Sequence, residues 1–307
     1  MTALAEAERR IGAMRAGVID VGSNTVRLLV AASGGAGLST VVSDRTHLGL
    51  ATEIERSGLI SAWKLSELAD VAAEYAARAR DAGADLLEVI VTAPGRQSAN
   101  AWVLHRVLAD ATGLSVRQLS AMEEGRLAYA GAVAGSRSVR EPIGVIDIGG
   151  GSTQLMVGTV GEPAWLHALD VGSLRLTERF VERDPASKSE LAAIAKAVEQ
   201  VFEGVTPPVP RSVLAVGGTA RALRRITGKR FGQKQLRGAL EALTSAPVQR
   251  VARKYEISPE RARVLPAGIL ILREADRRLG VTLEVARGGV REGAILALLD
   301  ELAEAAA

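Results

Sequence analysis

The sequence contains no cysteine, and this absence removes several classes of function at once. Without thiols the chain can form no disulfide framework, no thiolate zinc site and no cysteine nucleophile. Aromatic residues make up only 3% of the chain, which argues against a stacking platform for single-stranded nucleic acid. The formal net charge is only +3, from 38 basic and 35 acidic residues, so charge predicts no specific nucleic-acid partner.

Long hydrophobic runs are also missing. No stretch of 18 apolar residues occurs, so we expect no membrane-spanning segment. Charged residues interrupt the N-terminal segment where a secretory signal needs its apolar run, namely Glu6, Glu8, Arg9 and Arg10. We therefore expect a cytoplasmic protein, and a length of 307 residues is enough for two domains.

Lysine is scarce, since 32 of the 38 basic residues are arginine. Arginine binds phosphate oxygens better than lysine does, because its planar guanidinium group offers paired donors. A bias in the base composition of the genome explains the same excess more simply, so the excess alone predicts no function.

The strongest pattern is an internal duplication. Residues 18–30 contain two apolar runs around a polar, glycine-containing turn, which predicts a β-hairpin, and residues 144–157 repeat the pattern. A constant offset of 127 residues pairs Asp20 with Asp147, Gly22 with Gly149, Leu28 with Leu155 and Val30 with Val157. The repeat predicts two lobes of similar topology.

Helical and strand patterns alternate after each hairpin, which predicts an α/β architecture. Helices are expected at residues 61–82, 100–112, 123–133, 191–202, 261–278 and 293–305, and strands at 86–91, 212–216 and 283–285. We place the N-terminal lobe at residues 1–132 and the C-terminal lobe at 133–307, with the last helix, about 293–307, packing back on the first lobe. The three tryptophans lie in apolar contexts and are expected to be packing residues: Trp63, Trp102 and Trp165.

Each hairpin places an aspartate at the end of a strand, before glycine and small polar residues. Such a turn can hold a carboxylate beside backbone N–H groups that bind phosphate, with a divalent cation bridging the two. Gly149, Gly150 and Gly151 would let a phosphate approach the backbone closely. A tight hairpin that needs glycine for its turn is the alternative, and the second copy favours the phosphate interpretation. A third strand-to-glycine turn, at 215–220, is a weaker signal.

Together these motifs resemble the actin/hexokinase/Hsp70 superfamily and, within it, the exopolyphosphatase/guanosine pentaphosphate phosphatase (Ppx/GppA) family. The segments that carry the resemblance cover nearly the whole chain: 19–30, 123–129, 145–153, 170–177, 215–220, 266–271 and 289–293. The resemblance implies duplicated actin-like ATPase domains of ribonuclease H-like topology, with the site in a cleft between the lobes. It also implies Mg²⁺-dependent removal of the terminal phosphate from linear inorganic polyphosphate, or of a phosphate from guanosine pentaphosphate.

The resemblance assigns roles to individual residues. Glu124 matches the general base that activates water, although an acidic first helical turn is otherwise an ordinary solvated feature. Asp147 matches the metal ligand, and Asp20 is its counterpart in the first lobe. Phosphate binding is assigned to Ser23, Asn24, Arg27, Arg96, Gly149, Gly150, Gly151 and Ser152, and the third turn adds Gly217, Gly218 and Thr219.

Three of the departures from the family pattern bear on activity. Gln154 replaces a glutamate expected to help hold the cation, Leu50 replaces the glutamate of a usual Leu-Gly-Glu-Gly segment, and Ala286 replaces a serine. These changes leave open a weakened relative that senses polyphosphate or guanosine penta- and tetraphosphate. A nucleotide-dependent kinase or scaffold is a third alternative. The resemblance further suggests a homodimer, and we expect no membrane partner.

Overall fold

The computed structural model describes residues 14–34 and 37–305. The N-terminal segment, for which no signal peptide is expected, lies outside these residues, as do the last two residues of the expected C-terminal helix. No helix in the described ranges is both long enough and apolar enough to cross a membrane. The chain divides into two compact units, Met1–Leu127 with Val290–Ala307 and Ala128–Gly289. The first boundary therefore falls within a helix, five residues before the expected one, and the last helix belongs to unit 1.

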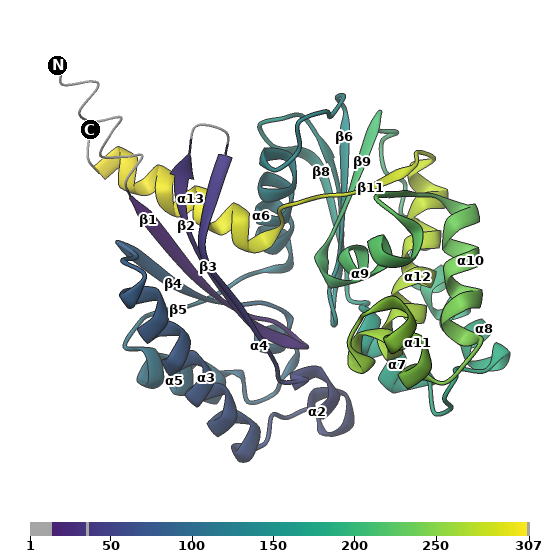
Figure 1. The fold of residues 1–307 in the computed structure, drawn as a ribbon, viewed down its shortest axis with the longest axis horizontal. Helices are drawn as coiled ribbons and strands as arrows, with labels where there is room; N and C mark the ends of the chain where they lie inside the picture. Colours follow the sequence, from purple (N-terminus) through teal and green to yellow (C-terminus); the bar gives the residue numbers. More distant parts are fainter. Residues whose placement is uncertain (1–13, 35–36, 306–307) are drawn as a thin grey trace. The chain divides into compact units, whose positions relative to one another are not determined.

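Unit 1 contains a five-stranded mixed sheet in the order β3-β2-β1-β4-β5, where β1 pairs antiparallel with β2 and parallel with β4. Helices α3 and α5 cover one face of the sheet, and α13 covers the other (Figure 1). The elements are β1 (Arg15–Val21), β2 (Thr25–Gly34), β3 (Gly37–His47), α2 (Leu50–Ser57), α3 (Ala62–Asp81), β4 (Leu86–Val91), α4 (Ala93–Gln97), α5 (Ala101–Thr112), β5 (Val116–Gln118), α6 (Ala121–Ala134) and α13 (Val290–Ala305).

The alternation of side chains along β1 explains the two apolar layers of unit 1. Ile19 and Val21 face the cluster under α3 and α5, whereas Ala16 and Val18 face the cluster under α13. Every residue of β1 after the first is buried, so a sheet covered on both faces produces the continuous apolar run seen in the sequence.

Unit 2 contains a six-stranded sheet in the order β10-β11-β9-β6-β7-β8. Strands β6 and β7 form the second hairpin, and β9 pairs parallel with β6 as β4 does with β1. The elements are β6 (Ile143–Ile148), β7 (Thr153–Gly158), β8 (Pro163–Leu169), α7 (Ser173–Phe180), α8 (Lys188–Val201), β9 (Ser212–Val216), α9 (Gly217–Thr227), β10 (Arg230–Phe231), α10 (Gln233–Thr244), α11 (Val248–Tyr255), α12 (Pro259–Leu279) and β11 (Leu283–Val285). The chain is thus an α/β protein of two actin-like domains, as the duplication predicts. The order β3-β2-β1-β4-β5 corresponds to β8-β7-β6-β9-β11, and unit 2 adds β10 at the edge.

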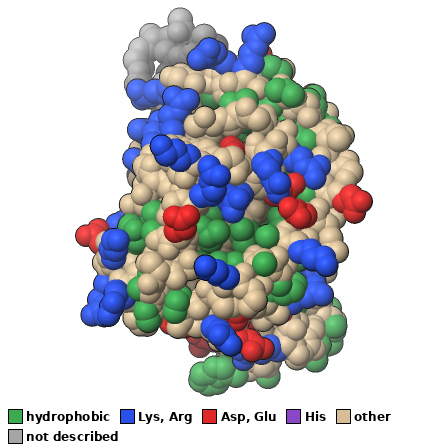
Figure 2. All heavy atoms as spheres, turned by 90° about the vertical axis from the view of Figure 1, so that its right-hand side faces the viewer, with side chains coloured by type: hydrophobic (Ala, Val, Ile, Leu, Met, Phe, Trp, Pro, Cys, Tyr) green, Lys and Arg blue, Asp and Glu red, His purple; other side chains and the backbone are tan. Residues whose placement is uncertain are grey.

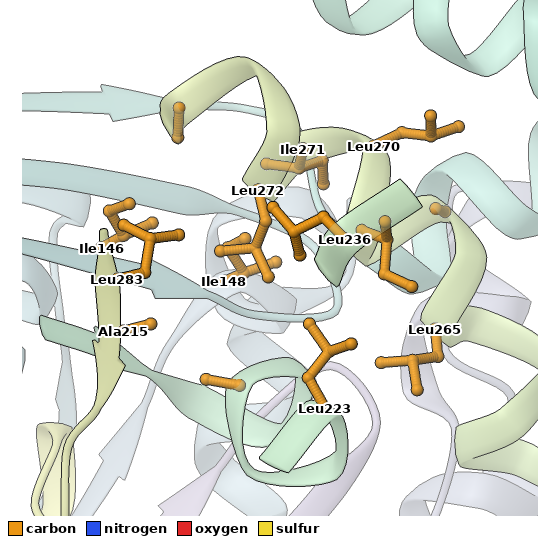
Figure 3. Packing of buried hydrophobic residues seen from close by; sticks show 14 of the residues in the cluster. Ile146, Ile148, Ala215, Leu223, Leu236, Leu265, Leu270, Ile271, Leu272 and Leu283 are labelled. Carbon is orange, nitrogen blue, oxygen red and sulfur yellow. The ribbon is translucent and has the colours of Figure 1, made fainter. Parts of the chain in front are cut away.

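Helix α12 lies at the centre of the unit 2 core. Its residues Leu265, Ile269 and Leu272 join one buried cluster with Ile146 and Ile148 of β6. Figure 3 shows side chains from α12 and from strands β6, β9 and β11 pointing toward one another in this cluster. This core fixes the strand ends from which the candidate site is built.

The expectation that all three tryptophans are packing residues is wrong for two of them. Trp63 is 77% exposed and Trp102 is 65% exposed, whereas Trp165 packs partly buried against the unit 2 core. Each exposed tryptophan stands two residues before a buried leucine of its helix, Leu65 or Leu104. Two residues turn an α-helix by about 200°, which directs the tryptophan away from the core.

Candidate functional site

The turn of the unit 2 hairpin directs backbone N–H groups to one side. Ser173 donates its N–H to the carbonyl of Gly149, and the N–H groups of Leu174 and Arg175 donate to the carbonyl of Gly150, all at 3.0 Å. These carbonyl groups therefore point at the first turn of α7. Because a trans peptide is planar, the N–H of each following residue points the opposite way, so Gly150 and Gly151 direct their N–H groups away from α7. Successive N–H groups on one side form an anion-binding nest.

Asp147 is the second-to-last residue of β6, beside this nest, and is only 7% exposed. Strand β9 is parallel to β6 and pairs Val216 with Asp147, which brings the start of α9 next to the carboxylate. Gly217 has a φ angle of +85°, and a Cβ atom added there would lie 2.6 Å from Oδ1 of Asp147. The close approach requires glycine, so Asp147, the nest and the N-terminus of α9 converge at the carboxyl ends of parallel strands.

Two other residues of the third turn contact α12. A Cβ atom added to Gly218 would lie 2.5 Å from Nη2 of Arg261, so the guanidinium group lies against the glycine backbone. Thr219 is fully buried, its hydroxyl has no hydrogen-bond partner among the described residues, and its side chain packs against Gly268. Thr219 can therefore contribute its backbone N–H to a phosphate, as the first turn of a helix does.

The unit 1 hairpin repeats the geometry of the second one. Gly22 donates its N–H to the carbonyl of Thr25 at 3.1 Å, as Gly149 does to that of Ser152 at 2.9 Å. The carbonyl of Ser23 accepts from the N–H of Ala51 in α2, and the carbonyl of Asn24 accepts from the N–H groups of Leu48 and Gly49. In both units, N–H groups of a following segment thus donate to the carbonyl groups of the turn. Asn24 therefore directs its own N–H away from α2.

The two hairpins differ in the residue directly opposite the aspartate. Asp20 faces Arg27 across the strand pair, whereas Asp147 faces Gln154. Both of these long side chains donate to a hydroxyl of the turn, Arg27 Nε to Thr25 Oγ1 at 3.0 Å and Gln154 Nε2 to Ser152 Oγ at 3.2 Å. A guanidinium group opposes cation binding at Asp20, and the neutral amide does not oppose it at Asp147.

A cation at Asp147 would need ligands from outside the protein. Within the described residues, no group of three or more histidine, aspartate or glutamate side chains could hold a metal ion. Mg²⁺ commonly binds through one or two carboxylates and completes its shell with water and substrate phosphate oxygens. The buried carboxylate beside the nest of backbone N–H groups fits that form of binding.

Two neighbouring glutamates of α6 have different environments. Glu123 caps the helix, because its carboxylate accepts from the N–H of Ser120 at 2.9 Å while the Ser120 hydroxyl accepts from the N–H of Glu123 at 3.1 Å. The hydrogen bond from the Ser120 backbone is the main reason that the pKa of Glu123 is lowered. Glu124 is only 7% exposed and is therefore no solvated helix start. The acidic first turn thus contains one cap and one buried carboxylate.

Glu124 forms an ion pair with Arg96. Nη2 of Arg96 lies 2.8 Å from Oε2 of Glu124, and Nη1 donates to the carbonyl of Leu119 at 2.9 Å. The arginine lies on α4 after β4, and Glu124 follows β5, which is the parallel neighbour of β4. The N–H of Thr92, just before α4, donates to the carbonyl of Val21 at the end of β1. The carboxyl ends of β1, β4 and β5 therefore bring the pair to the end of the sheet that holds the hairpin turn.

The other two departures have structural roles. Leu50 is fully buried in the apolar core of unit 1. Ala286 donates its N–H to the carbonyl of Ala215 at 3.0 Å, which extends the pairing of β11 with β9. Of the three departures, only Gln154 directly faces a candidate site carboxylate.

A model of the Ppx/GppA phosphatase family matches residues 29–302. The chain belongs to the Ppx/GppA phosphatase family. Exopolyphosphatase 1 of Mycobacterium leprae is 30% identical over 323 residues, covering 96% of this chain and 92% of that protein. Exopolyphosphatase 1 of Mycobacterium tuberculosis, strain H37Rv, is 31% identical over 316 residues, covering 96% and 91%.

Solved structures agree with this membership. The Ppx/GppA enzyme of Aquifex aeolicus superimposes with a TM-score of 0.77 at 25% identity, covering 92% of this chain and 99% of that one. An exopolyphosphatase from Cytophaga hutchinsonii has a TM-score of 0.85 at 18% identity, covering 94% and 98%, and supports the fold alone. The match to the family model begins at residue 29, after the first hairpin turn, whereas the match to the mycobacterial proteins covers 96% of the chain.

Within this Ppx/GppA chain, several residues at the candidate site have no assigned role in the sequence analysis. Ser120 could have been found from its serine-to-glutamate spacing, which is typical of a helix cap. Thr25 could have been found from the offset of 127 residues, because that offset makes it the counterpart of Ser152 in the second hairpin. Ser173 lies within the 170–177 segment of the resemblance, which gave it no role of its own. Arg261 carries no such signal, since only the packing of α12 brings it to the turn.

Proposed function

We propose that the chain is a Mg²⁺-dependent exopolyphosphatase that hydrolyses the terminal phosphate of linear inorganic polyphosphate. The observation that carries the proposal is the buried carboxylate of Asp147 beside the N–H nest of Gly150 and Gly151. Membership of a phosphatase family and relatives named exopolyphosphatase support the choice of substrate. Phosphoryl transfer is catalysed mainly by positioning and by electrostatic stabilisation, which this arrangement can supply.

In this proposal the turn N–H groups and the Ser152 hydroxyl bind oxygens of the terminal phosphoryl group. Asp147 would hold Mg²⁺, which neutralises negative charge on the phosphate oxygens. Glu124 accepts a proton from the attacking water, and Arg96 orients the Glu124 carboxylate through their 2.8 Å ion pair. Glu124 belongs to unit 1 and Asp147 to unit 2.

The proposal is tested by measuring phosphate release from short polyphosphate, long polyphosphate, guanosine pentaphosphate and ATP, each with and without Mg²⁺. We expect release from polyphosphate that requires Mg²⁺. Glu124→Gln should lower kcat by about 10²–10⁴-fold, because it removes a positioned base while keeping the size of the side chain. No release from any of the four substrates would overturn the proposal.

The adjacent glutamate supplies the matched control. Glu123→Gln makes the same chemical change one residue away, on a partly exposed capping side chain. It should keep kcat within a few-fold of the wild type and lower the melting temperature slightly, because the cap is weakened. Equal losses of kcat in the two variants would contradict the assignment of Glu124.

The residue opposite Asp147 favours a second candidate, a weakened relative that senses polyphosphate or guanosine penta- and tetraphosphate. Gln154 is an uncharged side chain where the family pattern has a glutamate, so the cation has one carboxylate on this strand pair. Calorimetric binding of these ligands without turnover would favour the sensor. Turnover of guanosine pentaphosphate faster than that of polyphosphate would instead assign the nucleotide as the substrate.

A further inference from the structure

Unit 2 contains a basic pocket that is separate from the turns described above. Its volume is about 510 Å³, and its lining comes from the 135–140 segment after α6, the start of β9, and the short strands β10 and β11. Arg211 precedes β9 in the pocket lining, whereas Gly217 follows β9 at the candidate site. Six residues of extended chain span about 20 Å, so the pocket lies well away from the nest.

Part of the pocket lining lies on the sheet face opposite the apolar core. Val213 and Val285 belong to the core cluster, so the residues next to them, Leu214 and Glu284, point to the other face. Leu214 pairs with Glu284, and Glu284 pairs with Arg230, so these three side chains share that face. The polar 135–140 segment lines the pocket together with them.

Positive charge dominates the lining. Six basic side chains surround the pocket against the single carboxylate of Glu284: Arg137, Arg140, Arg211, Lys229, Arg230 and Arg287. Glu284 is already engaged, with Lys229 Nζ at 2.6 Å and Arg230 Nε at 3.9 Å. Within residues 14–34 and 37–305, no carboxylate lies within 4.0 Å of the other four guanidinium groups. A concave surface with this excess of arginine attracts anions that carry several phosphate groups.

We propose that this pocket binds a condensed phosphate anion, a chain of two or more linked phosphate groups. Its cations lie on or next to four neighbouring strands, β6, β9, β11 and β10. Neighbouring strands lie about 4.8 Å apart, so the set spans about 14 Å. A chain of linked phosphates can contact such a set, and a single phosphate cannot. The lining contains no aromatic side chain, so it offers no stacking surface for a nucleobase.

The binding test uses isothermal titration of the full chain with tripolyphosphate in the presence of EDTA, because arginine contacts need no metal ion. Arg211→Glu with Arg287→Glu should remove a binding component or weaken it by about tenfold or more, since two attractive charges become repulsive. Basic side chains occur over much of the surface shown in Figure 2, so a charge control is needed. Arg237→Glu with Arg250→Glu makes the same change on exposed helical positions of unit 2 and should bind as the wild type does.

Arginine modification of the wild-type chain supplies a second measurement that needs no variant. Tripolyphosphate should slow the reaction of phenylglyoxal with Arg137, Arg140, Arg211 and Arg287, as measured by peptide mass spectrometry, and should leave Arg237 and Arg250 unchanged. Protection of both groups alike would overturn the proposal. Equal binding of tripolyphosphate by the pocket variant and the control variant would also overturn it.

The source of the phosphate chain is distinguished by comparing three probes. If the pocket variant, Arg211→Glu with Arg287→Glu, loses binding of tripolyphosphate while it still binds guanosine tetraphosphate, the ligand is an inorganic phosphate chain. If the variant loses binding of both probes, the pocket accepts any condensed phosphate, including that of a nucleotide. Loss of duplex DNA binding with tripolyphosphate unaffected would overturn the proposal. The pocket variant should keep the wild-type rate of any phosphate release from tripolyphosphate with Mg²⁺. The binding result therefore stands or fails separately from the proposed hydrolysis.

Discussion

Replacing Gln154 by glutamate would place a second carboxylate directly opposite Asp147. The two residues pair across β6 and β7, and both are buried, with Gln154 1% exposed. Opposite side chains of an antiparallel pair lie about 5 Å apart. Two like charges at that distance repel by about 3 kcal/mol at an effective dielectric constant of about 20. In the absence of divalent cations, Gln154→Glu should therefore destabilise the fold by about that amount.

The expected destabilisation corresponds to a fall in melting temperature of about 6–12 °C, given about 2–4 °C per kcal/mol for domains of this size. Mg²⁺ bound between the two carboxylates removes the repulsion. Excess Mg²⁺ should therefore raise the melting temperature of Gln154→Glu far more than that of the wild type, which has one carboxylate on this strand pair. The assay is thermal unfolding in EDTA and in Mg²⁺, with Ca²⁺ as a second cation.

Gln249→Glu is the control, because it makes the same substitution on an exposed position of α11. It should change stability by no more than about 0.5 kcal/mol and should show no Mg²⁺ dependence. Acidic pH should reduce the destabilisation by Gln154→Glu, since one carboxylate of the pair then takes up a proton. If the variant and the control respond equally to EDTA and Mg²⁺, Gln154 and Asp147 do not share a cation site.

Three further perturbations test other contacts. Hydrogen bonds from the N-cap serine hydroxyl and from backbone N–H groups lower the pKa of Glu190 from 4.5 to about 2, so its contribution is present above pH 4.5 and lost toward pH 2. Glu190→Gln should flatten the fall in melting temperature across that window, and an unchanged fall would contradict the capping role. Tyr129→Phe removes a 2.7 Å hydrogen bond to a backbone carbonyl, and denaturant unfolding should show a loss of about 1–2 kcal/mol, whereas no loss would contradict that bond. Gly217→Ala would crowd Asp147 and should abolish phosphate release. Gly228 also has a positive φ angle, +84°, but no atom lies within 4 Å of an added Cβ, so Gly228→Ala should keep phosphate release. Equal activity of the two variants would refute the crowding at Asp147.

Periodicity was sufficient to predict the elements that carry strong apolar patterns. The expected helix at 100–112 is α5, and the expected strand at 212–216 has the bounds of β9. Strands β3 and β8 had no such signal, because their residues are mostly half-buried or exposed and contain few consecutive apolar side chains. An edge strand with one solvent-exposed face lacks the continuous apolar run that identifies β1.

The candidate site was predictable as far as the duplication extends. The constant offset identified Asp20, Asp147 and both turns, because the chemistry and the repeat lie within single short segments. The ion pair of Arg96 with Glu124 was not predictable from spacing, since 28 residues separate them and only the order of β4 and β5 brings them together. The basic pocket was also not predictable from the sequence, because its cations come from four separate segments that only the fold brings together.

The duplication keeps the same turn geometry in both units, but the facing pair of side chains has a net negative charge in only one hairpin. Asp20 is opposite Arg27, so the first strand pair is close to neutral, whereas Asp147 is opposite an amide. The hydrogen bonds of the turn do not depend on this difference, since both long side chains donate to the equivalent hydroxyl. The turn geometry is therefore the same in the two hairpins, although the charge of the residue opposite the aspartate differs. Under the proposed function, a cation that needs a carboxylate would bind at the second hairpin, and the first would bind phosphate directly through N–H groups and a guanidinium group.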